Sequence, residues 1–174
     1  MNASGTAAPP MRPDPREFRH TMGRFATGVT LITTRTDEGV HAMTANGFLS
    51  VSLEPAVVLV SLGTHTRMAD LLRRTGRYGV NVLAEDHEAH SRRFAGQDTL
   101  GSPAEFADAG GIPLLSGALA HVGCRVTAHE HVGDHVLFFG RVCHLDHREG
   151  EPLVFYTGRY RVLHAQSDQH SFTH

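Results

Sequence analysis

A long antiparallel hairpin is predicted by residues 118–147, which read ALAHVGCRVTAHEHVGDHVLFFGRVCHLDH. Its two extended halves flank Gly133-Asp134, and these residue types favour a tight turn. If they form the turn, uninterrupted pairing places Cys124 directly opposite Cys143. We expect two reduced thiols that pack as small apolar side chains, with a disulfide as the alternative.

Short strands and a few helices are predicted around this hairpin. β-Branched or alternating runs predict strands at 27–34, 41–46, 48–53, 57–61, 78–82 and 153–156. Capping and spacing signals predict helices that begin after Asp14, at 66–75 and from Asp86 to Gly96. Residues 97–117 show no clear periodicity and are expected to form a long surface loop. Because strands and helices do not alternate regularly, the pattern favours a small, mainly β, antiparallel barrel over a doubly wound sheet.

The chain has the length and composition of one folded domain. It contains 174 residues, of which 40% are apolar and 20% are charged. Residues 1–13 are rich in Ala, Ser, Gly, Thr and Pro and predict a disordered arm. We therefore expect a barrel domain over 14–163 and a flexible tail over 164–174.

The charge pattern excludes several classes of function. All 16 basic residues are arginine, so chemistry that uses a catalytic lysine is excluded. The net charge of −2 provides no polybasic surface for nucleic acid.

The longest aliphatic run, 56–60, is too short to span a membrane, and the start of the chain lacks the features of a signal peptide. We expect a cytoplasmic protein that binds neither nucleic acid nor membrane.

Fourteen histidines raise the possibility of a metal site. The pairs His129/His131 and His87/His90 have spacings that can ligate zinc, but no Asp, Glu or Cys is spaced to complete either site. We therefore expect solvated surface histidines and no metal. The sequence also lacks a Walker A loop and a G-x-G-x-x-G motif, so any nucleotide cofactor is held without a Rossmann unit.

The junction from 57 to 67, VVLVSLGTHTR, has the features of an anion site. An apolar strand leads to a polar loop and then to a helix whose free N–H groups point back at that loop. Together with Arg67, these donors suit a phosphate group. The alternative is ordinary helix capping by Thr64 or Thr66.

A second polar segment, 42–52 (AMTANGFLSVS), lies inside an extended stretch. A planar heterocycle needs a closely approaching backbone and nearby N–H and amide donors. Thr44, Ala45, Asn46 and Gly47 are candidates to supply them. The alternative is an ordinary strand with a glycine bulge.

Taken together, these segments resemble a known family. FRHTMGRFATGVT (18–30) and MTANGFLSVSLEP (43–55) are similar to sequences of the flavin reductase family of FMN-binding split barrels. That family includes the reductase components of two-component flavin monooxygenases, such as 4-hydroxyphenylacetate 3-monooxygenase. The resemblance continues through 76–83, 91–95, 133–135 and 158–160, and it covers about residues 15 to 163.

The resemblance implies a Greek-key split β-barrel with a few short helices and a homodimeric NAD(P)H:flavin oxidoreductase. Such an enzyme reduces FMN or FAD with NADH or NADPH and supplies reduced flavin to a partner monooxygenase. The residues implied for the flavin ring and ribityl chain are Thr44, Ala45, Asn46, Gly47, Phe48, Ser50 and Val51. Those implied for its phosphate are His65, Thr66 and Arg67, and those for the helix that closes over it are Arg93 and Phe94. Nicotinamide is assigned to His135, the implied catalytic residue, and to Gly158, Arg159 and Tyr160.

Two features leave alternatives open. Gly47 stands where the family usually has serine, so only a backbone N–H is available there. His135, implied to orient the nicotinamide or to favour the anionic reduced flavin, is otherwise a surface histidine of a hairpin turn. The competing functions are a non-catalytic flavin-binding module and an enzyme with a tightly held flavin that reduces its own substrate, for which residues 97–117 leave room.

Overall fold

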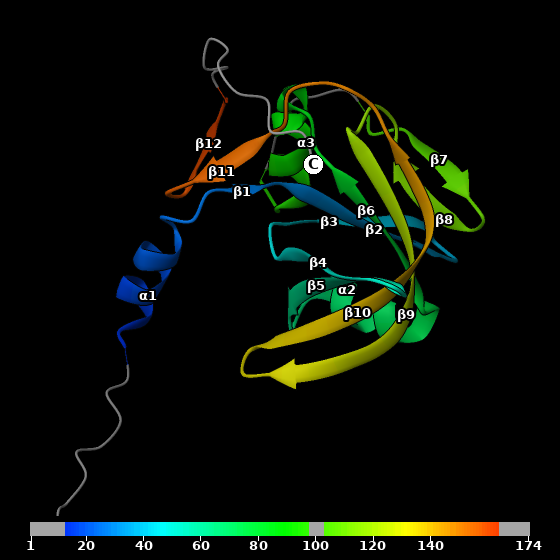
Figure 1. Cartoon of the computed structure of the whole chain (residues 1–174), viewed down its shortest axis with the longest axis horizontal. Coiled ribbons are helices and arrows are strands. Elements are labelled where there is room, and N and C mark those ends of the chain that lie inside the picture. Colours follow the sequence, from blue (N-terminus) through cyan, green and yellow to red (C-terminus); the bar gives the residue numbers. More distant parts are fainter. Residues whose placement is uncertain (1–12, 98–102, 164–174) are drawn as a thin grey trace, which may run out of the picture.

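Antiparallel strands dominate the computed structural model, which describes residues 13–97 and 103–163 (Figure 1). The helical segments are α1 (Pro15–Met22), α2 (Arg67–Thr75), the 3-10 turn η1 (Glu85–His87) and α3 (Glu88–Phe94). The strands are β1 (Thr27–Gly28), β2 (Thr30–Thr36), β3 (Gly39–Ala45), β4 (Phe48–Leu53), β5 (Ala56–Gly63), β6 (Arg77–Val82), β7 (Phe106–Ala109), β8 (Ile112–Leu115), β9 (Ala120–Val132), β10 (His135–His147), β11 (Val154–Tyr156) and β12 (Arg159–Arg161). The predicted tail, and the predicted arm except its last residue, lie outside the described residues.

Seven strands form the main sheet in the order β3-β2-β6-β9-β10-β5-β4, with every neighbouring pair antiparallel. The two edge strands, β3 and β4, are consecutive in the chain and are joined only by Asn46-Gly47. The sheet therefore curls into a barrel that stays split along these two edges. This confirms the predicted antiparallel barrel.

The interior of the barrel is a continuous apolar core. Its members come from β2, β5, β6, β9 and β10 and include the fully buried Ile32, Val60, Val80 and Phe138. Helix α2 closes one end of the barrel with Met68, Ala69 and Leu72. It begins at Thr66, whose hydroxyl accepts a hydrogen bond from the N–H of Ala69, and it ends at Gly76, which has a left-handed φ of 65°. Each large side chain buried here contributes roughly 1.5–3 kcal/mol.

A second apolar cluster lies beside the barrel and supports the smaller elements. Val29, Leu31, Leu83, Leu115 and Leu153 are buried together, and side chains of α3, β7, β11 and β12 pack against them. The strands β11 and β12 form a three-stranded sheet with β1. This cluster therefore fixes α3 and β12 relative to the end of β3.

The predicted strand 27–34 is divided into two elements. β1 pairs with β11, whereas β2 joins the barrel, and Val29 lies between them. Val29 is buried in the second cluster, and its carbonyl accepts a hydrogen bond of 2.9 Å from the N–H of Leu83. One run of β-branched residues thus serves two sheets, which its composition does not reveal.

The first helix forms as predicted, because the carboxylate of Asp14 accepts hydrogen bonds from the N–H groups of Arg16 and Glu17. Its apolar face is nevertheless exposed: no residue of α1 is buried. The helix predicted from Asp86 starts as the 3-10 turn η1 before α3 continues it.

The long hairpin has the predicted turn but not a continuous register. Pairing shifts between Phe139 and Gly140 and again between Val142 and His144. Val142, and not Cys143, therefore lies opposite Cys124, because bulges insert unpaired residues into a ladder. Cys124 is buried, which raises the pKa of its thiol to about 12, and Cys143 is exposed. Both thiols are free.

The prediction of an irregular loop over 97–117 is wrong for most of the described part. β7 and β8 form a hairpin that turns at Gly110-Gly111, and all four residues of β8 are buried. The side chain of Asn81 accepts a hydrogen bond of 2.7 Å from the N–H of Leu115. Two strands of four residues are too short to show periodicity, so tertiary packing decides this segment. Residues 98–102 lie outside the described residues.

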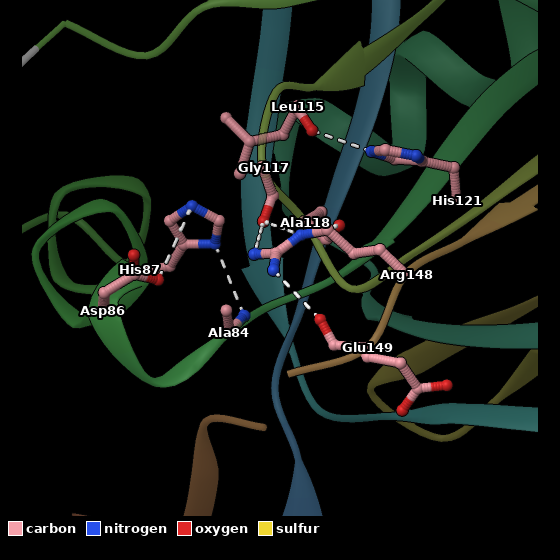
Figure 2. Close-up of polar contacts among 9 residues, drawn as sticks. All are labelled: Ala84, Asp86, His87, Leu115, Gly117, Ala118, His121, Arg148 and Glu149. Carbon is pink, nitrogen blue, oxygen red and sulfur yellow. Dashed lines mark hydrogen bonds and ion pairs between the residues drawn. The ribbon is translucent and has the colours of Figure 1, made fainter. Parts of the chain in front are cut away.

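A polar network fixes the connection from β8 to β9, as Figure 2 shows. The guanidinium of Arg148 donates to the carbonyls of Gly117 and Ala118. Beside it, the Nδ1 atom of His87 accepts a hydrogen bond of 3.3 Å from the N–H of Ala84. Burial lowers the pKa of His87, and this ring is therefore held neutral.

Candidate functional site

Two adjoining cavities open around the junction of β3 and β4. The first, which we call the α3 cavity, has a volume of 510 Å³. Its lining comes from the end of β3, one face of α3, and β11–β12: Val29, Thr44, Ala45, Asn46, Glu88, Arg92, Ala95, Gln97, Phe155, Gly158, Arg159, Tyr160 and Arg161. It therefore unites the segments at 44–46 and 158–160, to which the family resemblance separately assigns flavin and nicotinamide.

The second, which we call the α1 cavity, has a volume of 1000 Å³ and lies between α1, β1, β4 and β5. Its lining is mostly apolar and includes Phe18, Phe25, Phe48 and Leu59. Asn46, Phe155 and Gly158 line both cavities, so the two spaces meet at the β3–β4 junction.

A chain of polar contacts fixes the walls of the α3 cavity. The Thr44 hydroxyl donates to the Ser91 carbonyl at 2.7 Å, and the hydroxyls of Ser91 and Tyr160 lie 2.8 Å apart. The Arg92 guanidinium lies over the Tyr160 ring, 4.8 Å from its centroid, while its Nε donates to Glu88 at 2.8 Å. Strand β3, helix α3 and strand β12 are thereby held in one arrangement.

Hydrogen-bonding groups without a partner lie where the cavities meet. β3 and β4 are edge strands, so alternate backbone N–H and C=O groups of each face outward without a strand partner. Across residues 13–97 and 103–163, the side-chain amide of Asn46 forms no hydrogen bond. The buried hydroxyl of Thr27, which lines the α1 cavity, also lacks a partner there. This is a set of donors and acceptors suited to the edge of a planar, polar ring system.

Gly47 allows β4 to start close against β5. Its carbonyl accepts a hydrogen bond of 2.8 Å from the N–H of Ser61. A Cβ atom at position 47 would lie 3.1 Å from the Cβ of Ser61 and 3.2 Å from its carbonyl oxygen. A serine at this position therefore requires a shift of Ser61 by a few tenths of an ångström.

The loop before α2 makes capping contacts and also contacts the tip of the long hairpin. The Thr66 hydroxyl caps α2, and both the N–H and the hydroxyl of Thr64 donate to the carbonyl of Asp134. Arg67 forms an exposed ion pair with Glu38 at 2.6 Å. The capping role of Thr66 is thus present, and the three residues from 65 to 67 line neither of the two cavities.

His135 lies at the tip of the hairpin and not in either cavity. It pairs with Gly63 of β5, and its Nδ1 lies 2.8 Å from the carboxylate of Asp134. That hydrogen bond and the charge of His135 lower the pKa of Asp134. Within one chain, His135 adjoins the loop before α2 but is not brought together with Arg159 and Tyr160.

Four other predicted residues also lie outside these cavities. Arg93 is exposed and lies over the ring of Phe94, with 5.8 Å between the guanidinium carbon and the ring centroid, and Phe94 packs into the second apolar cluster. Ser50 and Val51 are exposed on β4, where Val51 forms a bulge.

Further residues on one face of α3, not predicted from the sequence, line the site. Glu88, Arg92 and Ala95 all line the α3 cavity. Their spacing of four and three residues places them on one helix face, and this spacing could have identified Arg92 as a further candidate beside Arg93. The role of Ser91 depends on a partner far away in the sequence, so no local pattern could have revealed it.

In the two described ranges, no three His, Cys, Asp or Glu side chains come together as a metal site. No described helix has the length and apolarity needed to cross a membrane.

Comparisons with known proteins agree on one family. The model of the flavin reductase like domain matches residues 22–164. An NADH-dependent flavin reductase of a Rhodococcus species is 47% identical over 152 residues, which are 86% of each chain. The reductase subunit HsaB of a flavin-dependent monooxygenase of Rhodococcus jostii is 40% identical, covering 84% of this chain and 77% of HsaB. The structure of flavin reductase PheA2 superposes with a TM-score of 0.85 at 43% identity and covers 88% of this chain and 100% of PheA2. The chain therefore belongs to the flavin reductase like domain family.

Proposed function

We propose that this chain is an NADH-dependent flavin reductase, which transfers a hydride from NADH to FMN or FAD and supplies reduced flavin to a partner monooxygenase. The observation that carries the proposal is the α3 cavity, because the end of β3 and strand β12 line one space. The family resemblance assigns flavin to the first and nicotinamide to the second. The relatives named as NADH-dependent flavin reductase and as monooxygenase reductase subunit support the same activity.

The residues around Asn46 fit the ring system of a flavin. The ring carbonyls and nitrogens of a flavin require donors and acceptors in one plane near the backbone. Such groups are supplied by the edges of β3 and β4 and by the Asn46 amide and Thr27 hydroxyl, which have no partner in the described part of the chain. We therefore assign the segment 44–48 to the ring, with Ser50 and Val51 beside the ribityl chain.

The flavin phosphate is assigned to His65, Thr66 and Arg67 at the start of α2. Free N–H groups and the positive end of the helix dipole favour a phosphate there. The ion pair of Arg67 with Glu38 is exposed on both sides, so it contributes little and can be exchanged for a phosphate contact.

Bound flavin and NADH supply the redox chemistry, and the chain positions them. Tyr160, held by Ser91 and Arg92, forms a flat wall for the nicotinamide side of the α3 cavity. The left-handed φ of 76° at Gly158 turns the chain sharply beside it. We assign Arg92 to the nicotinamide side of this cavity, together with Gly158, Arg159 and Tyr160. Holding the two rings in contact accounts for much of the rate that such an enzyme needs.

A homodimer is proposed because one chain leaves its site open. The apolar side chains of Phe18, Met22 and Phe25 are 56%, 52% and 72% exposed beside the α1 cavity. Exposed apolar surface of this kind marks an interface. We assign His135, the proposed catalytic residue that orients the nicotinamide, to a site completed by the second copy. Sedimentation of the protein and of Phe25→Asp tests this: the variant should shift towards monomer and lose NADH oxidation together with dimerisation.

The cytoplasm is the proposed location. NADH is the proposed hydride donor, and the thiols of Cys124 and Cys143 are free, as expected in a reducing compartment. The domain proposed for this activity extends over residues 14–163.

The decisive experiment follows NADH and NADPH oxidation by the purified protein with FMN, FAD, riboflavin or no added flavin. Flavin-dependent oxidation of NADH is expected, and no consumption with any flavin would overturn the proposal. Consumption without added flavin by a yellow protein would indicate a tightly held flavin. Flavin binding without consumption would indicate a non-catalytic flavin-binding module.

A further inference from the structure

A row of arginines crosses the outer surface of the barrel on β6, β9 and β10, whereas the proposed flavin site lies at β3 and β4. Arg125 of β9 is the direct cross-strand partner of Arg77 on β6 and of Arg141 on β10. Directly opposed residues on adjacent strands point to the same face with Cβ atoms about 5 Å apart. Three like charges therefore lie side by side across three neighbouring strands.

This arginine row (Arg77, Arg125 and Arg141) is not neutralised by the chain. In the described residues, the side chains of Arg125 and Arg141 form no ion pair or hydrogen bond, and the guanidinium of Arg77 donates only to the carbonyl of Gly110 at 3.0 Å. The carboxylate of Asp108 already pairs with Arg35 at 2.8 Å and accepts from the N–H of Gly111 at 2.9 Å. Like charges directly opposite each other destabilise a sheet, so the row carries a cost that the fold itself does not offset.

A third cavity lies over two of the three guanidinium groups. Its volume is 430 Å³, and it is lined by Arg77, Asp108, Ala109, Gly110, Ile112, Arg125, Cys143 and His144. It shares no lining residue with the α3 cavity or the α1 cavity. The β7–β8 hairpin forms one wall, and the bulge at Cys143 places His144 opposite Gly123 on the other side.

We propose that this third cavity is a second, non-catalytic binding site for a small organic anion whose phosphate group is held between Arg77 and Arg125. Guanidinium groups bind phosphate oxygens through paired N–H donors, which a single ammonium cannot do. The volume lies within the range of small-molecule sites, and Ile112 with the hairpin backbone provides a wall for an organic part. Arg141, the cross-strand neighbour of Arg125, adds a third positive charge beside the site.

Calorimetric titration of the FMN-saturated protein with pyrophosphate, and separately with ADP, tests the proposal, because bound FMN occupies the phosphate site proposed at residues 65–67. Binding is expected, and Arg125→Gln should weaken it by about ten- to a hundredfold, because a charge-assisted hydrogen bond contributes 1.5–3 kcal/mol. Arg125→Lys keeps the charge without the paired donors and should give an intermediate loss. Tighter binding of ADP than of pyrophosphate identifies a nucleotide as the ligand class, whereas equal affinities identify the phosphate alone.

The matched control is Arg74→Gln, which removes one exposed positive charge from α2 and should leave the titration unchanged. Neither Arg125 variant should alter NADH oxidation, so loss of this site and failure of the proposed activity are separate outcomes. Absence of binding, or equal binding by the wild type and Arg125→Gln, would overturn the proposal. A thermal unfolding measurement gives a further test. If sodium chloride at the same ionic strength raises the Tm as much as pyrophosphate does, the proposal is overturned.

Discussion

The hydroxyl of Ser91 lies 2.8 Å from that of Tyr160, which is 69 residues later in the chain. Ser91 is fully buried, and its carbonyl also accepts the hydroxyl of Thr44. One residue of α3 thus holds both the strand assigned to flavin and the strand assigned to nicotinamide. Ser91 is a positioning residue, because it acts on the proposed cofactors only through these two neighbours.

Replacing Ser91 by alanine should raise the KM for NADH several-fold with a smaller effect on kcat. The free energy of unfolding should fall by about 1 kcal/mol, the usual effect of losing one hydrogen bond. Steady-state kinetics and thermal unfolding measure the two effects. Tyr160→Phe removes the same hydrogen bond from the other side and should reproduce the KM change; an unchanged KM in both variants contradicts the positioning role.

Arg92 and Arg93 should differ sharply although they are adjacent. Arg92 lines the α3 cavity and lies over Tyr160, whereas Arg93 is exposed. Arg92→Gln is expected to raise the KM for NADH by about tenfold, the effect of losing a contact of 1–2 kcal/mol. Arg93→Gln, the matched control, should stay within about twofold of the wild type. A larger effect from Arg93 would favour the assignment made from sequence.

Introducing serine at Gly47 should destabilise the protein. The new Cβ meets the Cβ of Ser61 at 3.1 Å, which is closer than packed side chains normally lie. We expect a loss of about 1 kcal/mol, and a Tm lower by about 2–4 °C. Adding Ser61→Gly should restore part of this loss, because it removes one of the two close contacts. A Tm of Gly47→Ser equal to that of the wild type would show that β5 moves freely.

Acid should destabilise the protein through His87. Burial lowers its pKa in the folded state, so the unfolded chain binds the proton more readily. The contribution of neutral His87 to the free energy of unfolding is therefore present above pH 6.5, the ordinary pKa of histidine. It is lost as the pH falls below that value. His87→Asn keeps an acceptor for the N–H of Ala84 and does not titrate. When the pH is lowered from about 7.5 to 5, the Tm of the wild type should fall. The Tm of His87→Asn should fall by about 2–4 °C less over the same interval.

Local patterns predicted most of the fold. The Gly133-Asp134 turn and the cap at Asp14 are each specified by a few neighbouring residues, and the structure contains both. The β7–β8 hairpin was missed because its strands are short and depend on the contact of Leu115 with Asn81, 34 residues earlier. The register between Cys124 and Cys143 was wrong because bulges leave no mark in residue spacing.

Only the parts of the candidate site that have a local sequence pattern could be predicted. The segments at 44–46 and 158–160 were identified separately, and only the fold unites them in the α3 cavity. The side chains that connect them, Ser91 and Arg92, act through contacts across the chain. Such contacts depend on the angle at which α3 packs, and one sequence alone does not encode that angle in any local pattern.

The two edges of the main sheet are consecutive strands, and the seam between them is also where the two cavities meet. The flavin proposed to bind there would take the place of the missing neighbour strand for both β3 and β4. Its arrival would protect their outward amides from exchange with solvent, and its departure would expose them again. While bound, such a ligand would complete the hydrogen bonding of the barrel along this seam.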